Sequence, residues 1–324
     1  MNTDIGGSIA IKGFNYQKAS MILVMIKNFT KKDFKIIPEA KDDFEIKYED
    51  KTYFIQVKGT KNLSISNLTR RNKTKKSDTK PSILEKSMSP GKEDDIRKLF
   101  LYSLIESTKK ELTENRSYEI ISPIYRFSDK QKQVIIERLQ LHDSDIKRLN
   151  NQYIYITPFR NNYNDAMTFL KGTLVSEGLI ADNQRAQLIL GELCLQIDEK
   201  SEIKLLDIKD YEKKEINGEY LSQVFTTTEQ MNYFDNILDK LNLNHLKRMK
   251  VKKEKAKIPF LYNNLKKQIK DNIQIETLSD LNDEDAIEYL IDFIKELADN
   301  CNKELLYALA IECYCELGED IYAD

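Results

Sequence analysis

Acidic, amide and lysine side chains gather between residues 39 and 58, and together these groups can hydrolyse a phosphodiester. Glu39, Asp42 and Asp43 precede one short apolar run, while Gln56 and Lys58 lie at the end of the next. Carboxylate and amide oxygens are preferred ligands of Mg²⁺. A bound metal ion polarises a phosphate and lowers the pKa of its water, and a neighbouring lysine offsets the negative charge that develops. The pattern therefore favours metal-assisted hydrolysis with Mg²⁺ or Mn²⁺ as the cofactor.

A β-hairpin is needed to bring the two parts of this set together. We expect one over 43–58 whose register places Asp43 across from Lys58. The same register places Glu45 across from Gln56. Because side chains alternate between the two faces of a strand, these four polar residues should share one face. The other face is then apolar and consists of Phe44, Ile46, Tyr53, Ile55 and Val57.

A helix over residues 8–28 is expected to contribute to the same site. Phe14, Gln17, Met21 and Val24 recur along it at helical spacing. Since Gln17 shares the apolar face of this helix, we expect its amide to point toward the sheet and to join the acids.

Strands and helices are expected to alternate along the first two thirds of the chain. The strands should lie at 33–38, 43–49, 52–58, 118–122, 152–157 and 203–208, and the helices at 8–28, 94–113, 129–141, 163–177 and 183–196. This order is typical of an α/β fold with a mixed sheet flanked by helices. Residues 59–92 are polar and basic without periodicity, which predicts a mobile loop.

The pattern becomes entirely helical after a linker near residue 225. Helical periodicity returns at 229–242, 258–270, 284–299 and 303–317. We therefore expect two domains, an α/β domain over 1–225 and a helical, acidic interaction region over 226–324.

Charge is segregated along the chain although the net charge is only −2. Residues 271–324 hold 16 acidic and two basic residues, a net charge of −14, which leaves +12 for residues 1–270. Basic residues concentrate in two runs, with eight against one acid in 58–80 and seven against one acid in 247–257. The neutral total is thus compatible with a body that faces DNA and an acidic tail with another partner.

Several classes of protein are excluded by composition. With two His and four Cys, neither a His-rich metal site nor a disulfide scaffold is indicated. The longest apolar runs, Met21–Ile26 and Leu305–Ile311, are far shorter than the roughly 20 residues of a membrane span. The N-terminal residues do not resemble a secretion signal. A cytoplasmic protein without membrane contact is expected.

Three motifs together resemble the PD-(D/E)xK nuclease superfamily, in its variant with Gln at the second acidic position. They are Gly13-Phe14-Asn15-Tyr16-Gln17, Glu39-x-x-Asp42-Asp43 and Gln56-Val57-Lys58. The pattern is similar to the effector endonuclease domain of anti-phage systems, found in CBASS, in nuclease-fused STAND sensors and in Lamassu. The resemblance is close over roughly residues 5–60 and extends weakly to about residue 220. It implies a restriction-endonuclease-like fold and divalent-metal-dependent DNA cleavage that is activated by oligomerisation.

Roles for the site residues follow from this resemblance. Asp43 takes the place of the metal-binding acid, Gln56 that of the second acid and Lys58 that of the catalytic lysine. Glu39 is implied as a further metal ligand, alongside Asp43 and Gln56, and Gln17 as a member of the catalytic site. Asp42 remains an alternative to Asp43, because neighbouring residues point to opposite faces and the register is inferred.

The acidic helical tail shows no second α/β unit that could sense a nucleotide. This favours a Lamassu-like nuclease subunit that works with an SMC-like ATPase and an accessory subunit over a CBASS enzyme. The resemblance further implies a homo-oligomer in the active state, double-stranded DNA as substrate, and inactivity until a partner or an oligomer assembles the site. A bacterial anti-phage effector is the function that fits best.

Contacts with the DNA backbone are expected from the basic loop that follows Lys58, because clustered cations neutralise phosphates. The candidates are Lys61, Arg70, Arg71, Lys73, Lys75 and Lys76. A disordered, solubilising loop is the alternative. The run 247–257 is either the solvated side of a helix or a partner of the acidic tail or of DNA. Cys313 and Cys315 are expected to be small buried apolar residues rather than zinc ligands.

Two other functions stay open at this stage. The first is a non-catalytic adaptor on a degenerate nuclease fold, since Gln replaces an acid at position 56. The second is an RNA-cleaving toxin on the same fold. Taken alone, Gln56 and Lys58 fit the solvated face of a surface hairpin better than a catalytic site; the acids and the first helix shift the balance toward a nuclease.

Overall fold

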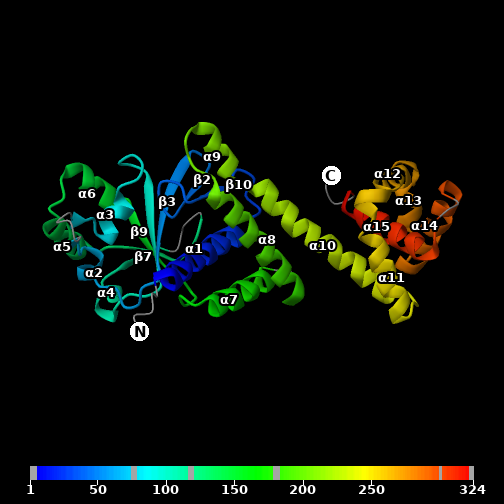
Figure 1. Cartoon of the computed structure of the whole chain (residues 1–324), viewed down its shortest axis with the longest axis horizontal. Helices are drawn as coiled ribbons and strands as arrows, with labels where there is room; N and C mark the ends of the chain where they lie inside the picture. The colour runs from blue at the N-terminus through cyan, green and yellow to red at the C-terminus, as the bar shows by residue number, and fades with distance from the viewer. Residues whose placement is uncertain (1–5, 74–78, 116–119, 178–182, 299–300, 321–324) are drawn as a thin grey trace. The chain divides into compact units, whose positions relative to one another are not determined.

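The computed structural model describes residues 6–73, 79–115, 120–177, 183–298 and 301–320 (Figure 1). The chain divides into two compact units, Met1–Phe225 and Thr226–Asp324. Each unit has buried apolar clusters of its own. Among the described residues, no helix combines the length and the hydropathy that a bilayer-spanning segment requires.

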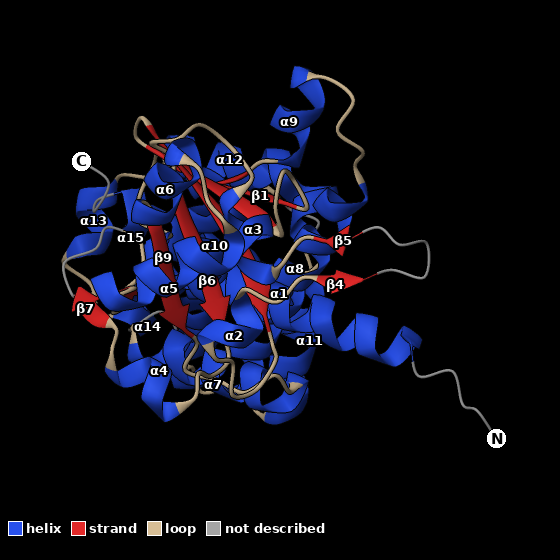
Figure 2. Cartoon of the chain, turned by 90° about the vertical axis from the view of Figure 1, so that its left-hand side faces the viewer, coloured by secondary structure: helices blue, strands red, loops and turns tan. Residues whose placement is uncertain are grey.

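The N-terminal unit is built on a mixed eight-stranded sheet of order β10-β1-β2-β3-β6-β9-β8-β7. Its strands are β1 (Lys35–Pro38), β2 (Phe44–Tyr48), β3 (Lys51–Lys58), β6 (Ile96–Leu101), β7 (Thr113–Asn115), β8 (Ile124–Arg126), β9 (Gln152–Ile156) and β10 (Ile216–Asn217). The central strands β3, β6 and β9 are parallel, and the other pairs are antiparallel. Two short strands, β4 (Asn72–Lys73) and β5 (Thr79–Lys80), form a separate ribbon (Figure 2).

Helices cover both faces of this sheet (Figure 1). One face carries α1 (Gly6–Asn28), α7 (Tyr163–Ser176) and α8 (Asn183–Glu202). The other carries α2 (Ile65–Leu68), α3 (Ile83–Met88), α4 (Glu106–Lys110), α5 (Asp129–Leu139) and α6 (Asp143–Asn150). A further helix, α9 (Ile208–Lys214), leads into β10. The architecture confirms the predicted α/β class, with a restriction-endonuclease-like mixed sheet flanked by helices.

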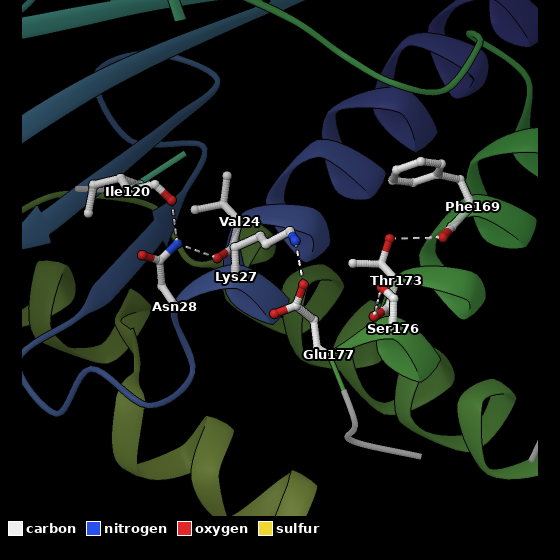
Figure 3. A network of polar contacts seen from close by, with 8 residues as sticks. All are labelled: Val24, Lys27, Asn28, Ile120, Phe169, Thr173, Ser176 and Glu177. Atoms are coloured by element: carbon white, nitrogen blue, oxygen red, sulfur yellow. Dashed lines mark hydrogen bonds and ion pairs between the residues drawn. The ribbon is translucent and has the colours of Figure 1, made fainter. Parts of the chain in front are cut away.

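The end of α1 is fixed by polar contacts on both of its sides (Figure 3). The Asn28 amide donates to the backbone oxygens of Val24, at 2.7 Å, and Ile120, at 2.8 Å. Lys27 forms an ion pair with Glu177, directly after α7. These contacts hold α1 against α7 and against the segment before β8, so that the apolar residues of α1 stay on the sheet.

The prediction of a helix over 94–113 is wrong for the first half of this range, which forms the central strand β6. A parallel strand that is buried on both faces shows no polar alternation, so its apolar residues imitate the face of a helix. Arg97 is fully buried in β6. Its guanidinium donates to the backbone oxygens of Met88, Pro90 and Asp95 at 2.9, 2.7 and 2.6 Å. Tertiary hydrogen bonds therefore permit an arginine where a central strand normally has an apolar residue.

Two further expectations fail for local reasons. The loop expected over 59–92 contains α2 and α3, each begun by a serine, Ser64 or Ser82, in a capping box. The strand expected over 203–208 is absent, since the described residues there form a loop followed by α9, which Asp207 caps. The expected strand over 118–122 falls partly on residues outside those described, and β8 begins only at Ile124.

The C-terminal unit is helical, as predicted. Its elements are α10 (Gly218–Lys240), which begins in the first unit, α11 (His245–Lys255), the π-helical turn η1 (Ile258–Tyr262), α12 (Asn263–Asn272), α13 (Ile275–Ser279), α14 (Asp283–Leu297) and α15 (Lys303–Asp320). Asn282 caps α14 by accepting the Asp285 N–H. Cys313 and Cys315 are buried among apolar side chains, which confirms their expected role.

The basic run 247–257 lies largely on α11 and pairs with acids on neighbouring helices. Lys250 lies 3.8 Å from Glu304, and Lys255 lies 3.2 Å from Glu312, both on α15. The possibility that this run pairs with the acidic tail is thus confirmed. The Lys250 side chain is 69% exposed, so its pair contributes about 0–1 kcal/mol, whereas the side chains of Lys255 and Glu312 are only 21% and 20% exposed.

Candidate active site

The hairpin forms, but its register differs by two residues from the predicted one. Phe44 pairs with Ile55, so Glu45 lies across from Phe54 rather than from Gln56. The reason is the turn, which consists of Glu49 and Asp50, with Glu49 in the left-handed region at φ 51°. A slip of one residue would exchange the faces, whereas a slip of two retains them. The predicted apolar face is accordingly confirmed, because all its members are buried in one cluster: Phe44, Ile46, Tyr53, Ile55 and Val57.

Asp43 links the start of β2 to the end of β3. Its Oδ2 atom accepts a hydrogen bond from the Val57 N–H at 2.7 Å. The Nζ atom of Lys58 lies 3.9 Å from the same oxygen. The Asp43 side chain is 17% exposed and that of Lys58 is 29% exposed, so a substrate can reach both. A carboxylate and an ammonium group are thus presented together at the end of the strand.

Asp42 is the most perturbed acid of this region. One oxygen, Oδ1, accepts the Asp43 N–H at 3.0 Å, and among the described residues no hydrogen-bond partner reaches the buried Oδ2. Burial first, and then repulsion from Asp43, raise the pKa of Asp42 to about 7. A cation bound between the two carboxylates would relieve both effects.

Gln56 is 4% exposed, and its Oε1 atom is buried without a hydrogen-bond partner among the described residues. An unpaired buried amide oxygen costs roughly 1–3 kcal/mol. Gln56 immediately precedes Val57, whose N–H binds Asp43. The described part of the chain holds no group of three or more His, Cys, Asp and Glu arranged to bind a metal. Carboxylate and amide oxygens suit a hard divalent cation, and Asp42, Asp43 and Gln56 supply such oxygens at this end of the hairpin.

Glu39 lies at the far end of the acidic loop, by which we mean residues 39–43. Its N–H donates to the Asp43 backbone oxygen at 3.0 Å, which closes the loop. Glu39 adopts the left-handed conformation, with φ 45°. Partial burial and repulsion from Asp43 raise the pKa of its carboxyl. The carboxylates of Glu39, Asp42 and Asp43 therefore share one region of negative potential.

Gln17 is not joined to this set by a hydrogen bond within the described part of the chain. It is half-buried on α1, which covers the apolar face of the hairpin. Its neighbour Tyr16 is the buried residue, and its hydroxyl forms a hydrogen bond with Thr157. The structure thus brings together Glu39, Asp42, Asp43 and Lys58, with Gln56 two residues before Lys58 on the same strand. The membership of Gln17 in the site stays a prediction.

The basic loop residues differ in how they are engaged. Lys61 and Arg70 are exposed. Arg71 is also exposed, but it forms a hydrogen bond to Glu85 at 2.8 Å through Nε and one to the Leu139 backbone oxygen at 3.0 Å. Lys73 lies on β4, and Lys75 and Lys76 lie outside the described residues.

Two residues that contact the site region were not anticipated. Tyr211 donates its hydroxyl to Glu45 Oε1 at 2.5 Å, and Lys214 Nζ donates to the Glu39 backbone oxygen at 3.0 Å. Both belong to α9, which is distant in sequence from the acids. Local patterns of spacing carry no signal for such a contact.

The sequence also matches known proteins. The family described as Cap4, dsDNA endonuclease domain, matches residues 5–201, which include the acidic loop, Gln56 and Lys58. The Lamassu protein LmuA of Bacillus sp. strain NIO-1130 is 52% identical over 317 residues, which cover 98% of this chain and 99% of that protein. The second similarity extends through the C-terminal helical unit, which the first does not reach.

Proposed function

Because the chain belongs to the Cap4 dsDNA endonuclease domain family, as a Lamassu-type nuclease effector, we propose that it cleaves double-stranded DNA with a divalent metal in anti-phage defence. One observation carries the proposal at the level of the site. Asp42 Oδ2 and Gln56 Oε1 are buried without hydrogen-bond partners among the described residues. Asp42 precedes Asp43 in the chain, Gln56 precedes the Val57 N–H that binds Asp43, and Asp43 lies beside Lys58. Such a set of groups suits a divalent cation, and it includes the lysine that phosphodiester hydrolysis uses.

Asp43, Asp42 and Gln56 would hold the Mg²⁺ or Mn²⁺, with Glu39 at the rim of the site. The bound ion would polarise the scissile phosphate and lower the pKa of the attacking water. The Val57 N–H fixes the orientation of the Asp43 carboxylate. Lys58 donates to a phosphate oxygen and offsets the charge that builds up on the phosphorus in the transition state.

DNA would approach along the basic loop, where Lys61 and Arg70 are exposed. Contacts to the phosphate backbone carry no sequence information, so cleavage should be weakly selective. The β4–β5 ribbon, which carries Lys73 and Lys80, would belong to the same interface.

We also propose that the nuclease is inactive by itself. A nuclease without restraint would damage the DNA of its own cell. The near-complete similarity to a Lamassu protein supports a multisubunit system, in which an SMC-like ATPase and an accessory subunit supply the signal and homo-oligomers are the active form. The C-terminal helical unit, which lies beyond the matched nuclease region, is the surface we assign to the partners.

The test is cleavage of supercoiled plasmid by the purified chain, alone and together with the products of the neighbouring genes. The reactions contain Mg²⁺, Mn²⁺ or EDTA, with RNA as a parallel substrate. We expect DNA cleavage that needs the metal and the partners and that is lost in Lys58→Ala and Asp43→Ala. Equal cleavage by these variants would refute the site, cleavage of RNA alone would refute the substrate, and no cleavage under any condition would favour an adaptor.

A further inference from the structure

The segment between the matched nuclease region and the C-terminal unit touches the acidic loop. We call this segment, residues 203–217, the α9 strap. It lies outside residues 5–201, which the nuclease family matches. It consists of a loop, α9 and the edge strand β10. It contacts the acidic loop directly at Glu39, and it contacts Glu45 of β2, which in turn binds the loop residue Lys41.

The first contact is made by Tyr211. Its hydroxyl donates to Glu45 Oε1 at 2.5 Å, and the same oxygen accepts the Lys41 N–H at 2.9 Å. Glu45 is 2% exposed, so its carboxylate depends on these donors for solvation. Tyr211 therefore holds the side chain that ties the middle of the acidic loop to β2.

The second contact is made by Lys214, which is 1% exposed. Its ammonium group donates to the Glu39 backbone oxygen at 3.0 Å and to the Ile203 backbone oxygen at 2.9 Å. Glu39 is in the left-handed conformation, which costs a residue with a side chain about 1–2 kcal/mol. Such strain persists only where surrounding contacts impose it. The bond from Lys214 is one of those contacts.

The strap is itself anchored to the same strands. β10 pairs with β1, with Ile216 opposite Ile36. Glu215 forms ion pairs with Lys35 at 2.7 Å and with Lys47 at 3.0 Å. The strap is thus held to β1 and β2, the two strands between which the acidic loop runs.

We propose that Tyr211 and Lys214 are positioning residues that set the acidic loop in the conformation in which its carboxylates converge on a divalent cation. This inference rests on the proposed function, because it concerns the same site. Donors that orient metal ligands from behind commonly change metal affinity by 10–100-fold when they are removed. Their contacts are to Glu45 and to the Glu39 backbone, so both would act through these residues.

The test uses the full chain and measures Mn²⁺ binding by titration calorimetry. The companion measurement is plasmid cleavage under activating conditions, with the half-saturating Mn²⁺ concentration and the rate at saturating Mn²⁺ determined separately. In Tyr211→Phe and Lys214→Met we expect the Mn²⁺ dissociation constant and the half-saturating concentration to rise about tenfold or more. The saturated rate should stay within about threefold of the wild type, a separation that a general loss of structure would not produce.

Two matched controls keep the test specific. Tyr220 also donates its hydroxyl to a glutamate, Glu192, at 2.9 Å, and Lys213 pairs with Asp210 at 3.1 Å; neither contact involves Glu45 or a residue of the acidic loop. Tyr220→Phe and Lys213→Met should bind Mn²⁺ as the wild type does. Unchanged Mn²⁺ binding in both strap variants, or an equal loss in the controls, would overturn the inference. Since Tyr211→Phe removes a single hydroxyl, it also serves if Lys214→Met does not fold.

Asp43→Ala separates this inference from the proposed function. If Asp43→Ala lost Mn²⁺ binding and cleavage while the strap variants behaved as the wild type, only the inference about the strap would be overturned. If Asp43→Ala behaved as the wild type, or if the unmodified chain bound no Mn²⁺, both the proposed site and the inference about the strap would be refuted.

Discussion

The Asp43 carboxylate accepts the backbone N–H of Val57 at 2.7 Å, and this bond joins the acid at the start of β2 to the residue between Gln56 and Lys58. The carboxylate is thereby fixed with one oxygen toward the strand, and the Lys58 ammonium group lies 3.9 Å from that oxygen. The Asp43 carboxylate thus has two roles. It accepts the Val57 N–H, and its negative charge can bind a metal ion. A substitution can remove the second role and keep the first.

Asp43→Asn retains an acceptor for the Val57 N–H and removes the negative charge. We expect metal-dependent cleavage to fall by about 100-fold or more, because an amide is a far weaker ligand and leaves Lys58 without its counter-charge. The thermal midpoint should change little, since a partly exposed ion pair contributes about 0–1 kcal/mol. Plasmid cleavage and thermal unfolding of the same preparation check this. Asp50→Asn in the hairpin turn is the control, and a similar loss of cleavage there would contradict the assignment.

The raised pKa of Asp42 predicts how stability depends on pH in EDTA. Burial and the Asp43 charge set this pKa at about 7 in the folded chain, against about 3.9 in an unfolded one. The folded state therefore holds the proton more tightly, and its stability falls as the pH rises from about 4 to about 7. Each pKa unit corresponds to about 1.4 kcal/mol, so the penalty at pH 8 is a few kcal/mol at most.

Asp42→Asn removes this penalty and should raise the free energy of unfolding more at pH 8 than at pH 5. Urea denaturation at the two pH values in EDTA measures it. Added Mn²⁺ should stabilise the wild type at pH 8 and lose this effect toward pH 6, as protons compete for the carboxylate. A gain that is equal at both pH values would show that Asp42 does not titrate in this range.

Alternation along the hairpin was enough to predict which side chains share a face, because the period of a strand is two. It was not enough for the register, which depends on the left-handed conformation of Glu49 in the turn. The contact between Tyr211 and Glu45 cannot be predicted from local patterns, because it joins segments that are far apart in the chain. The strand β6 was misread because Arg97, which resembles a helix surface residue, finds its partners only in the folded loop before it.

The loop before β6 predicts a matched pair of glycine variants. Gly91 has φ +72°, and an added Cβ would lie 2.2 Å from the Phe54 ring and 2.3 Å from the Asp95 carboxylate. Gly91→Ala should therefore destabilise the chain by about 2–4 kcal/mol, through backbone strain and overpacking. Gly172 lies within α7 with nothing within 4 Å of an added Cβ. Gly172→Ala should stabilise by about 0.5–1 kcal/mol. Urea denaturation of both variants checks the pair, and a neutral Gly91→Ala would contradict the loop conformation.

The basic loop predicts that neighbouring arginines differ in their effect on DNA binding. Arg70 and Arg71 are both exposed, but Arg71 is held by hydrogen bonds to Glu85 and to the Leu139 backbone oxygen. Arg70→Ala should weaken binding to duplex DNA and reduce the slope of log affinity against log salt by about one. Arg71→Ala should leave that slope nearly unchanged and lower the thermal midpoint instead. Fluorescence anisotropy with a labelled duplex in EDTA, repeated at several salt concentrations, measures both. If the two variants lost the same slope, the Arg71–Glu85 pair would have to open on DNA; if neither did, the loop would not lie on the phosphate backbone.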